Sequence, residues 1–588
     1  MKTNKNRLFA ALTATTLALT PCFAAGMMNA FAADSTTLTV TDSDGVNHDY
    51  NAYQIITGTT GTDGKLQSLA IGNGITQANL ITAVNAVLGS GTLGTSASVD
   101  DIAVKLATIT SDSDNANKLA KELAKYKIIS NAFDLAKDGD NYTNTGLANG
   151  WYLILDETTG LRTASTTDTD KVRSANLLQL TKDSVINTKH SLPTLDKKII
   201  GENENADGSA NRAAIGDTVE YEIDLTVPDV RGYDKYFYVV EDTLSAGLTY
   251  NDDLRITLGG APVTEDTDGV GDTVTTGDFY VTHDGTSIKV VFKNAATFFK
   301  NKTVDAPIVI TYTATLNENA VIGDAGNPNT AKLVYSNDPN EAAEGTPADG
   351  ENPPKPDEPG PNDDDVTGET PEDTVKTFTT AIKIKKVDQS GNPLAGATFK
   401  LSGTGINKVK VESVNSFTAD PNGTYWKLTN GSYTTTDPAT LADTSDYDST
   451  TTKYSKYTVE TASVASGDTN KSVTATVDEN GFLTFSGLDA GVYKLEETVA
   501  PTGYNGASAI DFTISADVNA TPVFSSDNSA VAIPAGGNMF ETSVENRYGA
   551  QLPETGGIGT KMFYLFGSAF VIGASTFIVT KKRVGENK

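Results

Sequence analysis

The sequence predicts a mainly β protein built from several antiparallel β-sandwich domains in tandem. Short alternating apolar runs recur between clusters of Thr, Ser, Gly, Asn and Asp, which is the pattern of short strands joined by turns. The chain of 588 residues is too long for one hydrophobic core and suits three or four domains. Helical periodicity is confined to one stretch near the N-terminus, so most of the core is expected to come from packed sheets.

The N-terminus carries the features of an export signal. Three basic residues precede an apolar stretch that ends near Ala25, and residues 30–33 (AFAA) offer the small side chains that a signal peptidase prefers. Residues 1–33 are therefore predicted to be a signal peptide. The alternative is a lipoprotein signal with Cys22 as the lipid acceptor, but Pro21 stands where a small flexible residue is wanted. Because Cys22 is the only cysteine, the mature chain would need a crosslink other than a disulfide.

The C-terminal residues 549–588 combine three features in order. The pentapeptide Leu552-Pro553-Glu554-Thr555-Gly556 is followed by an uncharged run at 562–580 and a basic cluster at 581–583. As a transmembrane helix the uncharged run would be about 28 Å long, enough to cross a hydrocarbon core, with the cations on the cytoplasmic side. An ordinary tail anchor preceded by a turn is the alternative interpretation.

This order resembles the cell-wall sorting signal of Gram-positive surface proteins. The resemblance implies that the cysteine of a membrane transpeptidase, a sortase, attacks the carbonyl of Thr555 and that an amine nucleophile then takes the acyl group. Pro553 holds the preceding residue in an extended conformation, which suits binding in a protease-like cleft. The chain is therefore expected to be a sortase substrate.

The composition argues against several classes of function. The 75 acidic and 45 basic residues give a net charge of −30, which repels nucleic acid and anionic lipid. The three histidines, His48, His190 and His283, are far apart, and no zinc spacing, phosphate-binding loop or nucleophile elbow is present in the sequence. We therefore expect no metal, no cofactor, no nucleic-acid partner and no conventional enzyme activity.

Between the terminal signals the chain divides into blocks at 34–190, 191–340, 341–373 and 374–548. The first block has strand patterns at its ends and three apolar stripes of helical spacing between them: Leu80, Val84, Val87 and Leu88; Ile102, Leu106 and Ile109; and Leu119, Leu123 and Tyr126. The second and fourth blocks are nearly all strand patterns. The acidic, Pro- and Gly-rich block 341–373 predicts a solvated linker or a long loop, in which Asp363, Asp364 and Asp365 offer a weak calcium site as an alternative.

The block 374–548 resembles the Cna-B-type domains of sortase-assembled pilins and surface adhesins. The resemblance rests on IKIKKVD at 382–388, LAGATF at 394–399, YKLEET at 493–498, APTGY at 500–504 and VEN at 544–546. In that family a lysine, a glutamate and an asparagine form an intramolecular isopeptide bond. Side-chain alternation along the strands selects Lys386, Glu497 and Asn546 as the inward-facing candidates. Glu496 is the neighbouring alternative acid, and a plain buried ion pair between Lys386 and Glu497 is the alternative to a bond.

Burial explains how such a bond could form. A lysine in an apolar core loses the solvation that keeps it charged, so its pKa falls and a nucleophilic neutral amine becomes available. A protonated Glu497 could then donate to the Asn546 carbonyl and pass a proton to the departing ammonia.

The block 191–340 is similar to the second, isopeptide-forming domain of major pilins. The residues that carry the resemblance are LDKKI at 195–199, VVEDTLSAGL at 239–248 and NTAKLVYSNDP at 329–339. The resemblance implies Lys197 as the amine, Asp242 as the acid and Asn329 as the amide. Alternation leaves Asn337 open as the amide, and Glu241 competes with Asp242.

The block 34–190 is interpreted as a degenerate copy of the last sandwich. LANGWYLILD at 147–156 aligns with residues 488–497 and places Asp156 at the acid position, and SVIN at 184–187 aligns with SVEN at 543–546. Val40 takes the position of Lys386, so no isopeptide bond is expected there. Chance similarity between turn-rich strands is the alternative.

The junction between the first two sandwiches carries a lysine, Lys189, in the sequence VINTKH at 185–190. Major pilins carry a lysine at this junction, usually within Tyr-Pro-Lys, that attacks the sortase-bound Thr of the next subunit. This chain has Asn-Thr-Lys, so the assignment of Lys189 rests on position. Lys182 is the second candidate, and an ordinary solvated lysine is the alternative.

Together these features resemble a major, or backbone, pilin of sortase-assembled fimbriae: tandem immunoglobulin-like, Cna-type β-sandwiches, the first with inserted helices. The resemblance implies a secreted, wall-anchored, adhesive pilus subunit, linked from Thr555 to Lys189 of the next copy after a transient membrane-inserted precursor. The implied partners are pilus and housekeeping sortases, identical subunits, minor or tip pilins, peptidoglycan and a host or bacterial surface ligand. A monomeric wall-anchored adhesin is the main alternative.

Overall fold

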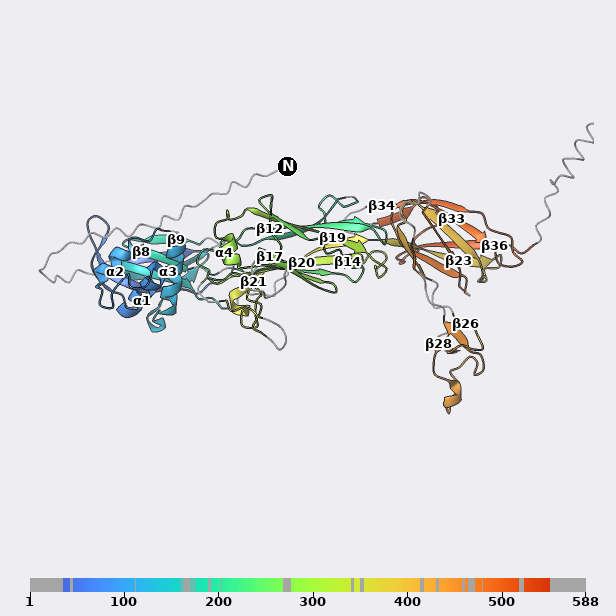
Figure 1. Cartoon of the computed structure of the whole chain (residues 1–588), viewed down its shortest axis with the longest axis horizontal. Coiled ribbons are helices and arrows are strands. Elements are labelled where there is room, and N and C mark those ends of the chain that lie inside the picture. The colour runs from blue at the N-terminus through green and yellow to red at the C-terminus, as the bar shows by residue number, and fades with distance from the viewer. Residues whose placement is uncertain are drawn as a thin grey trace, which may run out of the picture. The chain divides into compact units, whose positions relative to one another are not determined.

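The computed structural model describes residues 35–549 apart from short gaps at 43–45, 112, 160, 162–170, 172, 174, 189–191, 202, 268–276, 340–342, 349–353, 413–416, 430–432, 457–460, 464–470, 479 and 518–522. The predicted signal peptide, Lys189 and the whole sorting signal with Thr555 lie outside the described residues. Within the described part of the chain, no helix is long and apolar enough to cross a membrane. The predicted mainly β class is confirmed (Figure 1).

The chain separates into two compact units. One unit comprises residues up to 211, 218–315 and 327–377, and the other comprises 212–217, 316–326 and the chain from 378 onward. The first unit holds the first two sandwiches. The second unit holds the last sandwich together with two short segments contributed by the block predicted at 191–340.

The first domain is a sandwich of two small sheets with helices inserted. Its elements are β1 (Ser35–Thr41), β2 (Tyr50–Thr60), β3 (Leu66–Ile71), α1 (Gln77–Leu88), α2 (Val99–Leu106), α3 (Asp114–Lys125), β4 (Phe133–Asp134), β5 (Ala136–Asp138), β6 (Asn141–Ala148), β7 (Gly150–Asp156), β8 (Ala175–Leu180) and β9 (Ser184–Asn187), with a short 3-10 turn at Ile129–Asn131. One sheet has the order β5-β6-β1-β9 and the other β3-β2-β7-β8, with β4 added beside β2. Figure 1 shows the three helices grouped with these strands.

The three helices form where the apolar stripes predict them. Thr76, Ser98 and Ser113 cap their N-termini by accepting a backbone N–H with the side chain. The stripe residues lie in one core with the inner face of the β2 and β7 sheet. The helical stripes are therefore core, as predicted, and they cover the sheet.

The second domain is a larger sandwich. Its elements are β10 (Leu195–Ile200), β11 (Ala210–Arg212), β12 (Thr218–Thr226), β13 (Tyr238–Leu244), β14 (Leu248–Tyr250), β15 (Arg255–Leu258), β16 (Ala261–Pro262), β17 (Phe279–Asp284), β18 (Ser287–Phe292), α4 (Ala295–Phe299), β19 (Pro307–Leu316), β20 (Asn327–Ser336), β21 (Thr367–Glu369) and β22 (Asp373–Phe378), with a 3-10 turn at Asp364–Val366. One sheet has the order β10-β12-β19-β15-β16 and the other β11-β22-β20-β13-β18-β17, with β14 beside β19 and β21 beside β20. Every second residue of β19 from Ile308 to Leu316 is buried, which is the alternation of a sheet with one face on the core.

The acidic segment predicted as a solvated linker is instead part of this domain. Strands β21 and β22 both pair with β20, and the Asp363 carboxylate is only 1% exposed. It accepts backbone N–H groups of Glu344, Gly345 and Gly360 at 2.7, 2.8 and 2.7 Å. The segment is therefore a long loop of this domain, the second of the two predicted alternatives, and not a solvated linker, because loop amides satisfy an acidic side chain that composition alone marks as solvated. The Asp363 oxygens already accept these amides, and the described residues contain no group of three or more His, Cys, Asp or Glu side chains that could hold a metal ion.

The third domain is again a two-sheet sandwich. Its elements are β23 (Thr380–Asp388), β24 (Thr398–Gly403), β25 (Lys408–Glu412), β26 (Phe417–Ala419), β27 (Trp426–Lys427), β28 (Tyr433–Thr434), β29 (Tyr454–Lys456), β30 (Thr461–Ser463), β31 (Ser472–Thr476), β32 (Phe482–Leu488), β33 (Gly491–Val499), β34 (Ile510–Asp517), β35 (Val523–Ser526) and β36 (Phe540–Asn546), with a 3-10 turn at Pro438–Thr440. The sheets have the orders β30-β25-β32-β23-β36 and β31-β24-β33-β34-β35. Strands β26 to β29 form two small hairpins within a long excursion.

The first and third domains share one topology. The opening strand of each pairs in parallel with the closing strand, β1 with β9 and β23 with β36, and antiparallel with β6 and β32 respectively. In the other sheet, β2 pairs with β7 and β8 follows, as β24 pairs with β33 and β34 follows. This correspondence supports the interpretation of the first domain as a copy of the third with helices inserted.

Candidate crosslinking sites

The third domain brings Lys386, Glu497 and Asn546 together in its core. They lie on β23, β33 and β36, so both sheets contribute, and Lys386 and Asn546 are 0% and 1% exposed. Burial alternates along β36, with Val544 and Asn546 inward and Glu545 outward. The strand period of two therefore places the predicted residues on the core face.

The side chains are arranged for transfer between an amine and an amide. The Asn546 amide nitrogen donates to Glu497 Oε1 at 2.9 Å, and Lys386 Nζ lies 4.0 Å from the same oxygen. Lys386 Nζ donates to the carbonyls of Val544 at 2.9 Å and Val387 at 3.2 Å. The backbone N–H of Ala507 donates to Glu497 Oε2 at 2.6 Å, which fixes the carboxyl.

Burial lowers the pKa of Lys386, and the negative charge of Glu497 opposes that shift. The Asn546 side-chain oxygen is buried and accepts no hydrogen bond from the described residues. A buried oxygen without a hydrogen-bond donor lowers the stability of the folded state. The Asn546 oxygen is therefore free to accept a proton or a hydrogen bond when negative charge develops on it during the reaction. Glu496, the neighbouring alternative, pairs with Lys494 at 2.8 Å and is mostly outside this core.

The second domain brings Lys197, Asp242 and Asn329 together. They lie on β10, β13 and β20, again from both sheets, and Asn329 is 0% exposed. Lys197 Nζ donates to Asp242 Oδ2 at 2.6 Å. Burial lowers the pKa of Lys197, and the charge of Asp242 opposes that shift. Buried oxygens of Asp242 (Oδ1) and Asn329 (Oδ1) have no hydrogen-bond partner among the described residues.

The structure also separates the alternatives that the sequence left open. Glu241 faces away from the site and lies 3.6 Å from both Lys289 and Lys332. The Asn337 amide nitrogen donates to the carbonyl of Lys171 at 3.2 Å, in the first domain. Asp242 and Asn329 therefore share an environment with the buried amine, and Glu241 and Asn337 do not.

Sequence reasoning missed Tyr312 in this site. Its hydroxyl accepts from Lys197 Nζ at 2.8 Å and from the Asn329 amide nitrogen at 2.7 Å, and it donates to Asp242 Oδ2 at 2.5 Å. The signal that could have found it is its place among the inward positions of β19, since a buried tyrosine hydroxyl usually has a polar partner.

The first domain has an acid but no amine at the corresponding position. Val40 is fully buried on β1, and Asp156 Oδ2 lies 2.7 Å from His48 Nδ1. His48 Nε2 also lies 3.6 Å from Asp42 Oδ2. A histidine that the sequence analysis treated as isolated therefore occupies the space next to the acid.

The match of SVIN to SVEN is displaced by one residue in the structure. Val40 pairs with Ile186, whereas Lys386 pairs with Val544, two residues before the asparagine. Ile186 is consequently buried, Val185 is 63% exposed and Asn187 faces solvent. Asn187 does not occupy the inward position of Asn546, because a one-residue change of register reverses the faces of a strand.

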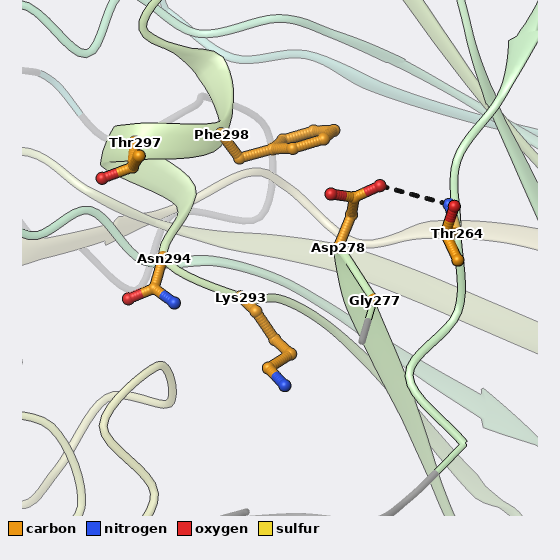
Figure 2. A pocket seen from close by; sticks show the side chains of 7 residues that line it. All are labelled: Thr264, Gly277, Asp278, Lys293, Asn294, Thr297 and Phe298. Carbon is orange, nitrogen blue, oxygen red and sulfur yellow. Dashed lines mark hydrogen bonds between the residues drawn. The ribbon is translucent and has the colours of Figure 1, made fainter. Parts of the chain in front are cut away.

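The junction is described only in part. Strand β9 ends at Asn187, and Lys182, the second candidate for the linkage, is exposed in the bend before that strand. A separate hollow of about 310 Å³ lies in the second domain. Figure 2 shows the residues that line it: Thr264, Gly277, Asp278, Lys293, Asn294, Thr297 and Phe298. Lys293 Nζ pairs with Asp266 there, and no predicted site residue lines it.

Comparison with known proteins agrees with this architecture. Residues 215–339 match a family model described as Gram-positive pilin backbone subunit 2, Cna-B-like domain. Residues 380–455 and 443–528 match a prealbumin-like fold domain, and residues 546–584 match the LPXTG cell wall anchor motif.

Two relatives come from one species. The trypsin-resistant surface T6 protein of Streptococcus pyogenes serotype M6 is 29% identical over 409 residues, which is 67% of this chain and 70% of that protein. The structure of the T6 backbone pilin, described as a modular three-domain protein, superposes with a TM-score of 0.50 at 16% identity over 88% of this chain and 99% of that chain. The major pilin subunit BcpA of Bacillus cereus gives a TM-score of 0.35 at 16% identity over 88% and 99%, too low to bear on the fold.

The sandwich domains and the anchor motif define a structural protein of the Gram-positive cell surface, anchored to the cell wall. The chain is a subunit of a pilus backbone, and its domains are similar to those of Gram-positive backbone pilins. The matched families are structural and not enzymatic.

Proposed function

We propose that this pilin is polymerised covalently from Thr555 of one copy to Lys189 of the next, and that its second and third domains carry internal Lys–Asn isopeptide bonds. The observation that carries the proposal is the pair of buried amine, acid and amide constellations in a wall-anchored chain without cysteine after Cys22. Such bonds suit a shaft under shear, because an amide does not depend on reversible contacts whose dissociation rates would limit its lifetime.

Each internal bond forms once, within the fold. The buried lysine passes one proton to the acid, and the neutral amine attacks the asparagine side-chain carbon. The C–N bond to the amide nitrogen then breaks, and that nitrogen leaves as ammonia after gaining a proton. The balance is one ammonium, one carboxylate and one amide giving a new amide, ammonia and a protonated acid. Asp242 and Glu497 are the proposed acids, acting in a single turnover.

The proposed partners follow from the anchor and the domains. A pilus sortase would join copies of this chain, and a housekeeping sortase would join the completed polymer to peptidoglycan. Minor or tip pilins and a host or bacterial surface ligand complete the proposed set, with adhesion as the role of the whole fibre.

A denaturing gel of wall extracts tests the linkage. Lys189→Arg keeps the positive charge but removes a usable nucleophile, so the ladder of covalent multimers should disappear while export and monomer anchoring persist. Lys182→Arg is the matched control and should leave the ladder intact. A ladder that survives Lys189→Arg and disappears with Lys182→Arg would move the linkage to Lys182, and a single band from the unaltered protein would favour a monomeric adhesin.

A further inference from the structure

The hydroxyl of Tyr312 lies at the centre of the second-domain site. It is within 2.5 to 2.8 Å of Lys197 Nζ, Asp242 Oδ2 and the Asn329 amide nitrogen. A single phenol therefore joins the amine, the acid and the leaving group.

The third domain does not need such a group. There Glu497 Oε1 accepts directly from the Asn546 amide nitrogen at 2.9 Å. In the second domain the acid is Asp242, whose side chain is one methylene shorter, and the Asn329 amide nitrogen donates to Tyr312 instead. In the second domain the Tyr312 hydroxyl thus accepts the hydrogen bond from the asparagine amide nitrogen that Glu497 accepts directly in the third domain.

Packing holds the Tyr312 ring in place. Tyr312 pairs with Tyr221 across β19 and β12, and their rings stack at 5.2 Å between centroids. Tyr250 packs edge-on at 5.8 Å. Because Tyr312 is buried with its ring confined on two sides, the hydroxyl stays directed at the three reacting groups.

We propose that Tyr312 is a catalytic residue of the second-domain crosslink and relays a proton from Asp242 to the departing Asn329 nitrogen. This inference rests on the proposed isopeptide function of that domain. Lys197 first gives a proton to Asp242 through their 2.6 Å contact. As the C–N bond of Asn329 breaks, protonated Asp242 donates to the phenol oxygen while the phenol proton passes to the leaving nitrogen. A second proton from the attacking Lys197 nitrogen returns to Asp242, so ammonia departs and Tyr312 ends as it began.

The phenol acts in its neutral form throughout. Burial raises the pKa of Tyr312 well above its ordinary value, and the neighbouring Asp242 raises it further. A phenolate base is therefore absent at neutral pH. A neutral hydroxyl can still receive one proton while it releases another, which is what a relay between two fixed partners needs.

The test measures bond formation in the full mature chain after a short pulse of expression and a chase. Peptide mass spectrometry follows the Lys197–Asn329 linkage, and the Lys386–Asn546 linkage is an internal reference. Tyr312→Phe keeps the ring and its stacking, and it should slow the second-domain bond at least tenfold without changing the third. The matched control is Tyr238→Phe, which removes a buried hydroxyl of the same domain that donates to the carbonyl of Thr226 and not to the site, and it should react at the unaltered rate.

A compensating change makes the test sharper. Asp242→Glu combined with Tyr312→Phe gives the acid the reach of Glu497 and should recover the bond. A slowing of less than tenfold in Tyr312→Phe would overturn the relay and leave the proposed crosslink standing. Absence of the Lys197–Asn329 linkage from the unaltered protein would instead overturn the proposed function of this domain, and the role of Tyr312 with it.

Discussion

The first and third domains use the same strand topology to enclose different buried polar groups. In the third domain the acid Glu497 faces Lys386 and Asn546, whereas in the first domain Asp156 contacts His48 and the position of the amine is occupied by Val40. The fold alone therefore does not provide a crosslink. Whether one can form depends on a single residue on the opening strand and on the register of the closing strand.

The comparison also separates two ways of stabilising the same sandwich. A bond from Lys386 to Asn546 would tie the first strand to the last and close a loop of more than 100 residues, which in chain-entropy terms is worth about 5 kcal/mol. The first domain relies on packing around its helices and on the hydrogen-bonded cluster of His48 with Asp156, Tyr50 and Asp42. We expect the domains to differ in their response to changes at the acid position.

The largest effect is expected at the third-domain acid. Glu497→Gln keeps size and hydrogen bonding but cannot cycle a proton, so Lys386 and Asn546 should stay unjoined and the free energy of unfolding should fall by about 5 kcal/mol. Calorimetry and trypsin sensitivity measure the loss. Intact mass should show the unaltered mature chain lighter than its sequence by two ammonias and the variant lighter by one.

The control for this change is Glu496→Gln, which should keep the intact mass two ammonias below the sequence mass. A Glu497→Gln chain that still lacks two ammonias would reassign the acid to Glu496. An unaltered chain that lacks three ammonias would contradict the comparison itself, because the first domain has no amine at Val40.

A smaller effect is expected at the matching position of the first domain. Asp156→Asn removes the charge that accepts from His48, so the free energy of unfolding should fall by about 2 kcal/mol, as for a hydrogen bond to a charged group, with no change in ammonia loss. Thermal unfolding of the variant measures this. The exposed Asp138→Asn on β5 is the control and should be neutral. If Asp156→Asn reduces the mass deficit of the intact chain by one ammonia, the first domain also carries an isopeptide bond.

The smallest effect is a pH dependence that appears only without the bond. In Asn546→Ala the amine of Lys386 remains free, and its pKa in the folded chain lies below the unfolded value of 10.5. The unfolded chain then binds more protons between the two pKa values, so stability should rise with pH through that window.

The slope of unfolding free energy against pH in Asn546→Ala, measured by denaturant titration, checks this expectation. Adding Lys386→Met removes the titrating amine and should abolish the extra slope. The crosslinked protein should lack that slope as well, since an amide does not titrate. Equal slopes in all three proteins would show that Lys386 is not held in the neutralising environment that the structure describes.

The sequence by itself determined the class of the domains, the helical stripes and the inward residues of the strands β23 and β36. Alternation is a local property with a period of two, so Lys386 and Asn546 could be placed on the core face without knowing their neighbours. The helices of the first domain were predictable for the same reason, because a repeat of 3.6 residues is also local.

Only the tertiary structure decided which inward residues meet. Asn329 donates to Tyr312, which also contacts the buried lysine, whereas Asn337 donates to the carbonyl of Lys171, although both asparagines lie on the same face of one segment. Tyr312 enters the site through the pairing of β19 with β12, and Ile186 replaces Asn187 inside the first domain because the closing strand is displaced by one residue. These choices depend on the register between strands distant in sequence, which is fixed by the packing of whole sheets and is not written in the pattern of any single strand.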